Sequence, residues 1–201
     1  ASDVTIKATF LGAHALPKQY KDNKEGYMDL VINEMLLKVA EEKLADYVDI
    51  FCEDGYFTVE DTKNLLTAAN KLGLQSKTHV NQFNAIGGVK ASVDLGALSV
   101  DHLEEMDEDD YNALQNSECM PTILPSCSFF LGIPYGPARK LIEKGLPVAL
   151  ATDYNPGSSP SGNMSFVASL GCIQLKMTPE EVINATTINT AYAIGVEKEL
   201  G

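Results

Sequence analysis

The chain has 201 residues, of which 45% are hydrophobic and 21% charged, which is the composition of an ordinary globular domain with room for a sizeable core. Its formal net charge of −13 argues against nucleic acid or an anionic membrane as a partner, because an acidic surface repels phosphate groups. The four cysteines form no CxxC pair, and no apolar run is long enough to cross a bilayer. We therefore expect reduced thiols and a cytoplasmic location.

Short β-branched runs alternate with longer stretches of helical periodicity along the whole chain. The predicted strands, in chain order, cover residues 4–13, 47–53, 75–81, 98–103, 120–124 and 148–152. The predicted helices cover residues 27–45, 58–72, 87–94, 107–115, 136–144, 162–174, 178–185 and 187–194. This alternation predicts a parallel sheet covered by helices.

Two of the predicted helices have specific start signals. Thr58 and Asp61 have the spacing of a capping box, although aspartate is a shorter partner than the usual glutamate or glutamine. Thr178 is followed by Pro179 and by two acidic residues, which gives the helix a cap, a proline at its first position and negative charge in its first turn.

Six strand–helix units fit either an open doubly wound sheet or part of a (β/α)₈ barrel. No GxGxxG motif follows the first predicted strand, which argues against a dinucleotide-binding sheet. A polar residue or proline ends each predicted strand: His14, Glu53, His79, His102, Pro125 and Asp153. Because barrel active sites form at the carboxyl ends of the strands, we favour an α/β (β/α)₈ TIM barrel that is incomplete, with two units missing.

The chain has only three histidines, and all three end predicted strands, as does Asp153. Histidine and aspartate supply nitrogen and oxygen ligands that suit Zn²⁺ or Fe²⁺, and such an ion can acidify a water and polarise a carbonyl. Alternatives stay open for each residue. A single histidine at a strand end is more often structural, Asp153 could cap the following turn, and the acidic residues around His102 could form a solvated rim.

Five strings, in this order and spacing, resemble the imidazolonepropionases of the amidohydrolase superfamily. They are TFLGAHALP at 9–17, FCEDGYF at 51–57, KTH at 77–79 followed by paired glycines at 87–88, DHLE at 101–104 and ATDYNPGS at 151–158. Any one of them is a weak signal, whereas five in order over nearly the whole chain are a strong one.

The resemblance implies an activity and a fold. Members of this family hydrolyse the cyclic amide of 4-imidazolone-5-propanoate to N-formimidoyl-L-glutamate, a step of histidine degradation. Their fold is a metal-dependent hydrolase barrel with a smaller β-sandwich domain formed by the chain termini. One zinc or iron ion is held by an HxH pair on the first strand, a histidine on the fifth and an aspartate on the eighth. The implied partner is a small-molecule substrate, and a homodimer is a further expectation.

The same resemblance implies roles for individual residues. His79 and Asp153 match the metal ligands of the fifth and eighth strands, and Asp153 and His102 match the catalytic residues, with Asp153 as the base. His14 matches a substrate contact. The loop that holds the propionate group is matched by Asn155, Gly157 and Ser158, where backbone N–H groups are expected to form an anion-binding nest.

The chain departs from the family pattern in two places. It contains no HxH motif, so residues 1–201 are expected to be a piece of the catalytic barrel that lacks the first strands and the β-sandwich domain. We predict that this piece alone is inactive and free of metal; turnover after addition of zinc and substrate would contradict this. Gln82 occupies a position where many members have glutamate, and glutamine can hydrogen-bond a substrate but cannot carry a proton.

Two other functions remain as alternatives. A purine or pyrimidine aminohydrolase of the same superfamily needs an acidic residue to protonate its leaving amine, and Gln82 disfavours that chemistry. A non-catalytic binding domain is the second alternative.

An incomplete barrel exposes strand edges and apolar surface, so we also predict that the isolated chain self-associates. Light scattering measures its mass, and a clean monomer would contradict this expectation.

Overall fold

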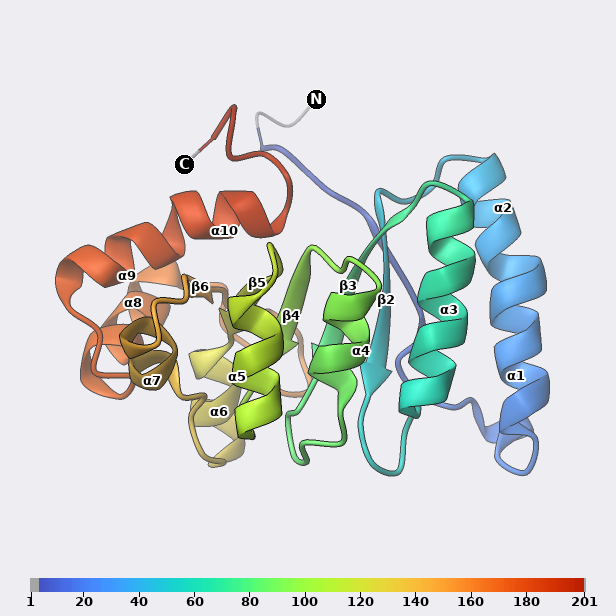
Figure 1. Ribbon diagram of the computed structural model, residues 1–201, viewed down its shortest axis with the longest axis horizontal. Coiled ribbons are helices and arrows are strands. Elements are labelled where there is room, and N and C mark those ends of the chain that lie inside the picture. Colours follow the sequence, from blue (N-terminus) through green and yellow to red (C-terminus); the bar gives the residue numbers. More distant parts are fainter. Residues whose placement is uncertain (1–3, 201) are drawn as a thin grey trace.

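A computed structural model describes residues 4–200 and contains six parallel strands in one sheet (Figure 1). The strands are β1 (Thr9–Ala13), β2 (Tyr47–Cys52), β3 (Gln75–Val80), β4 (Ser99–His102), β5 (Met120–Ile123) and β6 (Ala149–Leu150). Their order in the sheet is the chain order, so every strand pairs with its neighbour in sequence. A doubly wound sheet would reverse direction at a switch point, and this one does not. The sheet is therefore that of a partial (β/α)₈ barrel, as predicted.

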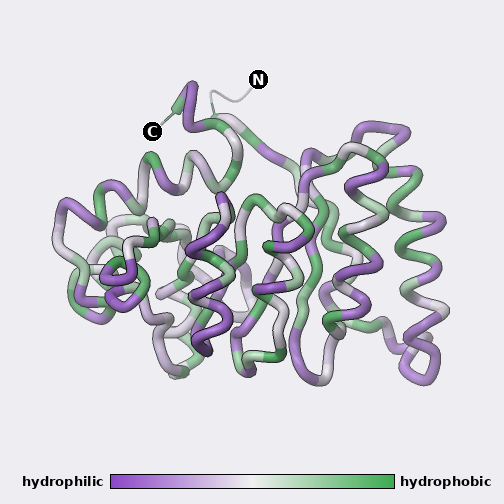
Figure 2. Tube along the Cα trace, viewed as in Figure 1, coloured by the Kyte–Doolittle hydropathy of each residue, from purple (hydrophilic) through white to green (hydrophobic). Residues whose placement is uncertain are grey.

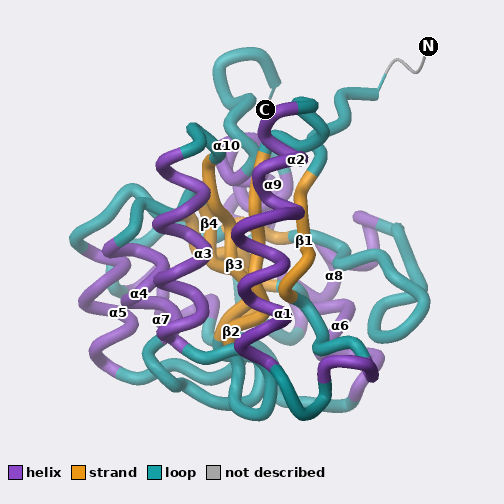
Figure 3. The backbone as a smooth tube through the Cα atoms, turned by 90° about the vertical axis from the view of Figure 1, so that its right-hand side faces the viewer, coloured by secondary structure: helices purple, strands orange, loops and turns teal. Residues whose placement is uncertain are grey.

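Helices connect successive strands and surround the sheet (Figure 3). They are α1 (Lys24–Leu30), the π-helical turn η2 (Val31–Met35), α2 (Leu36–Glu41), α3 (Val59–Lys71), α4 (Gly88–Asp94), α5 (Glu108–Gln115), α6 (Pro125–Leu131), α7 (Ala138–Glu143), α8 (Met164–Ile173), α9 (Pro179–Thr186) and α10 (Ile188–Ala193), with a short 3₁₀ helix, η1 (Lys18–Tyr20), before α1. The segments α1, η2 and α2 follow one another without a gap where one helix was predicted. Helix α6 was not predicted. None of the helices within residues 4–200 is long and apolar enough to cross a bilayer.

The first and last strands are shorter than predicted. Strand β1 begins only at Thr9, and the preceding residues 5–8 are exposed and are not part of a strand. Strand β6 has only two residues, Ala149 and Leu150. Neighbouring side chains donate hydrogen bonds to backbone carbonyls that a longer strand would use to pair with another strand. Asn189 Nδ2 donates to the Val148 carbonyl at 2.8 Å, and Thr190 Oγ1 donates to that of Leu150 at 3.2 Å.

The hydrophobic core lies between the sheet and the helices. On β3, the alternate residues Ser76, Thr78 and Val80 are buried, whereas Lys77 and His79 between them are partly exposed and lie on the opposite side of the strand. The outer helices alternate between hydrophilic and hydrophobic positions, as amphipathic helices that cover a sheet do (Figure 2). The core thus forms on the outer face of the sheet, and the inner face is left for polar groups.

Helix α10 covers the amino-terminal ends of the strands (Figure 1). Lys77 Nζ donates to the Ala193 carbonyl at 3.1 Å, and the Tyr47 hydroxyl donates to the Ile194 carbonyl at 2.6 Å. These bonds tie the inner face of β2 and β3 to the end of α10. The interior of the partial barrel is therefore accessible from the opposite edge, where the strands end.

The predicted capping box at Thr58 is present, and the predicted cap at Thr178 forms a second capping box. Thr58 and Asp61 bond each other's backbone N–H groups at the start of α3, and Thr178 and Glu181 do so at the start of α9. The Glu181 carboxylate also accepts hydrogen bonds from both terminal nitrogens of Arg139, each at 2.9 Å, and these bonds connect α9 to α7.

Replacing the cap residue Thr178 by alanine is expected to lower the free energy of unfolding by about 0.5–2 kcal/mol, because the backbone N–H of Glu181 at the start of α9 loses its partner. Urea unfolding followed by circular dichroism measures this. Thr67→Ala is the matched control, because Thr67 is exposed within α3 and alanine has the higher helix propensity. Equal stability of the two variants would contradict the prediction.

Candidate functional site

A cavity of about 520 Å³ opens at the carboxyl edge of the sheet. Its wall includes every site residue predicted from the sequence: His14, His79, Gln82, His102, Asp153, Asn155, Gly157 and Ser158. The sequence did not predict its apolar and aromatic wall, which consists of Leu11, Phe51, Tyr56, Phe83 and Leu131. Segments far apart in the chain therefore meet in one concave site with polar groups and an apolar lining, as small-molecule sites usually have.

A β-bulge at the end of β1 directs the chain toward this cavity. Phe10 pairs with Val48 and Ala13 with Ile50, so β1 has one residue more than β2 over this interval. Gly12 lies inside the bulge, and a Cβ atom there would come within 2.6 Å of the Phe10 ring. Any larger residue at this position would therefore require the Phe10 ring to move.

His14 follows the bulge and lies against the aromatic wall. Its ring stacks on Phe51 with centroids 5.6 Å apart, and it meets the His79 ring edge-on at 5.8 Å. Burial and the nearby His79 lower the pKa of His14 below its usual value. His14 is therefore a neutral imidazole at neutral pH, able to accept or donate one hydrogen bond.

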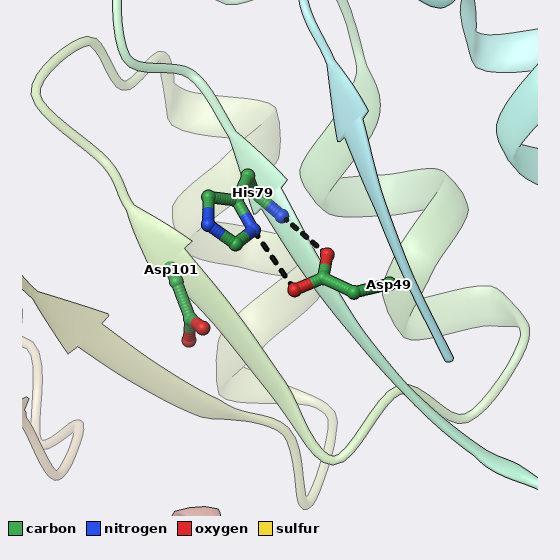
Figure 4. A group of neighbouring side chains, drawn as sticks. All are labelled: Asp49, His79 and Asp101. Atoms are coloured by element: carbon green, nitrogen blue, oxygen red, sulfur yellow. Dashed lines mark hydrogen bonds and ion pairs between the residues drawn. The ribbon is translucent and has the colours of Figure 1, made fainter. Parts of the chain in front are cut away.

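His79 is held by a carboxylate that the sequence analysis did not single out (Figure 4). The backbone N–H of His79 donates to Asp49 Oδ1 at 3.2 Å, and His79 Nδ1 forms an ion pair with Asp49 Oδ2 at 2.9 Å. Burial lowers the pKa of His79, but Asp49 more than offsets this and the pKa rises to about 9. Because Asp49 engages Nδ1, the other ring nitrogen, Nε2, is the one left to bind a ligand.

Asp49, His79 and Asp101 have ligand atoms within 4.8 Å of one another, so this trio is itself a candidate metal group. Its charges are already compensated, however. Lys77 Nζ lies 3.6 Å from Asp101 Oδ2, and Ser99 Oγ donates to Asp101 Oδ1 at 2.8 Å. Burial raises the pKa of Asp101, but Lys77 and His79 outweigh it and the pKa falls below its usual value. We interpret the trio as an ion-pair network that supports His79.

His102 reaches the cavity through an unusual backbone. Strand alternation would place it with Val100, against the helices, because Asp101 lies on the inner face. His102 and Leu103 instead have positive φ angles of 90° and 67°, and His102 lines the cavity, with its ring centroid 5.4 Å from that of His79. Non-glycine residues rarely adopt such angles, and strain of this kind concentrates at functional sites.

The loop after β6 is organised by its own side chains. The backbone N–H groups of Gly157 and Ser158 donate to Asn155 Oδ1 at 2.9 and 2.8 Å. These are the groups that were expected to form an anion-binding nest, and that expectation is wrong for this structure because Asn155 already occupies them. The Ser158 hydroxyl lies between Asn155 Oδ1, at 3.1 Å, and Asp153 Oδ2, at 3.4 Å. Asp153, with a φ of 52°, is thus fixed by the loop that follows it.

Gln82 lies in the wall of the cavity, whereas Glu53 lies outside it. Gln82 lines the cavity, and its amide nitrogen lies 3.6 Å from the buried Cys127 thiol on α6. Burial and then Asp153 raise the pKa of Cys127 to about 12, so the thiol stays neutral. Glu53 ends β2 as predicted but does not line this cavity. Its carboxylate accepts from the backbone N–H groups of Phe83 and Asn84, which fastens two loops together.

No protein-family model matches this chain. It is 61% identical over 199 residues to an imidazolonepropionase of Christiangramia forsetii and 60% identical over 198 residues to one of Flavobacterium johnsoniae. A third, from Alkaliphilus oremlandii, is 48% identical over 197 residues. By sequence, this chain is therefore similar to about half of each of these imidazolonepropionases. The similarity covers 98–99% of the chain, and the chain spans about half the length of these curated relatives, 47–48%.

Solved structures show the same fold at low sequence identity. A triazine hydrolase variant superimposes with a TM-score of 0.72 at 13% identity, covering 96% of this chain and 49% of the other. An adenosine deaminase from Xanthomonas campestris with bound zinc gives 0.69 at 16% identity, covering 94% of this chain and 48% of the other. These likenesses establish the barrel architecture alone. The imidazolonepropionases are much more similar to this chain in sequence than these structures are.

Proposed function

We propose that the cavity at the carboxyl edge is part of the active site of an imidazolonepropionase, a metal-dependent hydrolase that opens the cyclic amide of 4-imidazolone-5-propanoate. The observation that carries the proposal is the convergence on one cavity of His79, His102 and Asp153, which lie at or just after the carboxyl ends of three different strands. The sequence similarity to the named relatives supports the same substrate.

The residues fit a metal ion. His79 Nδ1 is engaged by Asp49, which orients the ring as carboxylates orient metal-binding histidines, and Asp153 contributes a carboxylate to the same cavity. His79 Nε2 and Asp153 would hold zinc or iron together with donors that the described residues do not supply. When bound, such an ion polarises a carbonyl and makes water more acidic.

The remaining steps belong to side chains. Asp153 would take a proton from the attacking water and give it to the ring nitrogen as the amide C–N bond breaks, and His102, in its protonated form, would stabilise the charge that develops on the ring oxygen. His14 and Gln82 would bind the imidazolone ring, His14 as a neutral donor or acceptor and Gln82 through its amide. Asn155, Gly157 and Ser158 would form the wall beside the propionate group. The Ser158 hydroxyl would be the donor there after turning away from Asn155 Oδ1 and Asp153 Oδ2, because Asn155 occupies the backbone N–H groups more tightly.

The test uses a chimera in which residues 1–201 replace the homologous stretch of the Flavobacterium johnsoniae relative, which supplies the rest of the length. The chimera should convert 4-imidazolone-5-propanoate to N-formimidoyl-L-glutamate and should leave cytosine and guanine unchanged. A folded chimera that deaminates either base, or that hydrolyses none of the three, would refute the proposal. The first outcome would favour the aminohydrolase alternative and the second a binding domain.

Replacing Asp49 by asparagine in the chimera is expected to weaken metal binding by about 10–100-fold, because a neutral amide supports His79 less well than a carboxylate. Competition with a chelator measures the affinity. Asp22→Asn, at an exposed ion pair near α1, is the control and should leave the affinity unchanged. Unchanged affinity in Asp49→Asn would show that Asp49 is only a structural partner of β3.

A further inference from the structure

A second buried carboxylate lies behind the other histidine of the cavity. His102 Nδ1 is 3.5 Å from Glu104 Oε2, and the two side chains are only 4% and 1% exposed. The other carboxylate oxygen, Oε1, accepts from the hydroxyl of Ser128 on α6 at 2.9 Å. Glu104 is therefore a fully enclosed acid that bridges the end of β4 and helix α6.

The two facing atoms have no hydrogen-bond partner. Among residues 4–200, His102 Nδ1 and Glu104 Oε2 are both buried without a hydrogen bond, and their 3.5 Å separation is that of a charge contact just longer than a good hydrogen bond. An unsatisfied buried polar atom costs about 1–3 kcal/mol, more if it is charged, so the pair is stabilised when each atom satisfies the other. A carboxylate oxygen only accepts, so the proton must be on His102 Nδ1.

We infer that Glu104, held by Ser128, is a positioning residue that fixes His102 in the tautomer with its proton on Nδ1. The cavity-facing nitrogen, Nε2, is then free to accept a proton, and Glu104 stabilises the imidazolium that results. The strained backbone at His102 and Leu103 turns the ring into this geometry. This catalytic consequence rests on the proposed function, whereas the tautomer is inferred from the Nδ1–Oε2 contact and needs no activity.

The tautomer can be read directly from the chain labelled with ¹⁵N-histidine, because three histidines give three spin systems. Long-range ¹H–¹⁵N spectra are recorded at alkaline pH, where free histidine is neutral, and are assigned with His14→Gln and His79→Gln. His102 should carry its proton on Nδ1. A wild-type His102 with its proton on Nε2 would overturn the inference, even if no Glu104 variant folds.

Glu104→Gln tests the cause. Its carbonyl should keep the bond from Ser128, so its amide nitrogen faces Nδ1 as a donor and the proton should move to Nε2. Glu105→Gln, the exposed neighbour, should leave the tautomer unchanged. A folded Glu104→Gln variant whose His102 stays in the wild-type tautomer would overturn the inference.

In the chimera, Glu104→Gln should lower kcat by about 10²-fold with little change in KM. If kcat is unchanged in an active chimera, the positioning role fails while the proposed function stands. If the tautomer switches as expected but the wild-type chimera has no hydrolase activity, the proposed function fails and the Glu104–His102 contact stands.

Discussion

Asp153→Asn in the chimera is expected to lower kcat by about 10²–10⁴-fold, the usual contribution of a general base. Asparagine keeps the size of the side chain and its contact with Ser158, but it cannot take a proton from water at neutral pH. Steady-state hydrolysis of 4-imidazolone-5-propanoate measures kcat, and elemental analysis of the same sample measures the metal content.

The metal content separates the two roles of Asp153. Loss of kcat with metal retained would identify it mainly as the base, and loss of both would identify it mainly as a ligand. Asp94→Asn on the exposed surface of α4 is the matched control and should behave as wild type. If Asp153→Asn keeps the activity of this control, Asp153 has neither role and only shapes the loop after β6.

Leu66→Ala is expected to lower the free energy of unfolding of the chain by about 2–5 kcal/mol. Leu66 lies on α3, is fully buried, and belongs to the hydrophobic cluster that packs α1–α3 against β1 and β2. Removing its side chain leaves a cavity that a packed sheet and helix cannot close completely. Urea unfolding measures the change.

Leu72→Ala is the control for this substitution, because Leu72 caps the same helix and is 37% exposed. Leu72→Ala should lower the free energy of unfolding clearly less than Leu66→Ala, since water already contacts the Leu72 side chain. Similar losses for the two leucines would contradict the packing of α3 against the sheet.

The order and type of most elements could be predicted because each has a local signal. Strands β2 to β5 lie where short apolar or β-branched runs end in a polar residue or proline, and α3 and α9 begin at the predicted caps. The position of the site could also be predicted, since parallel strands bring their carboxyl ends to one edge. Helix α6 could not be predicted because its apolar sequence follows β5 directly and no side chain caps its start.

Three features of the site depend on tertiary structure and could not be predicted. Asp49 supports His79 only because β2 and β3 pair in this register, although a charged residue within the apolar strand at 47–52 was a usable signal. The positive φ of His102 is set by its surroundings and not by its residue type. Asn155 fills the expected anion nest because its side chain folds back onto the following turn.

We propose that the carboxyl edge of this sheet holds a catalytic metal through His79 and Asp153. Anomalous diffraction from crystals of the chimera, at the zinc and iron absorption edges, tests it most directly. We expect one peak in the cavity, bonded to His79 Nε2 and to the Asp153 carboxylate. A peak between Asp49 and Asp101, or an active chimera with no peak in this cavity, would contradict it.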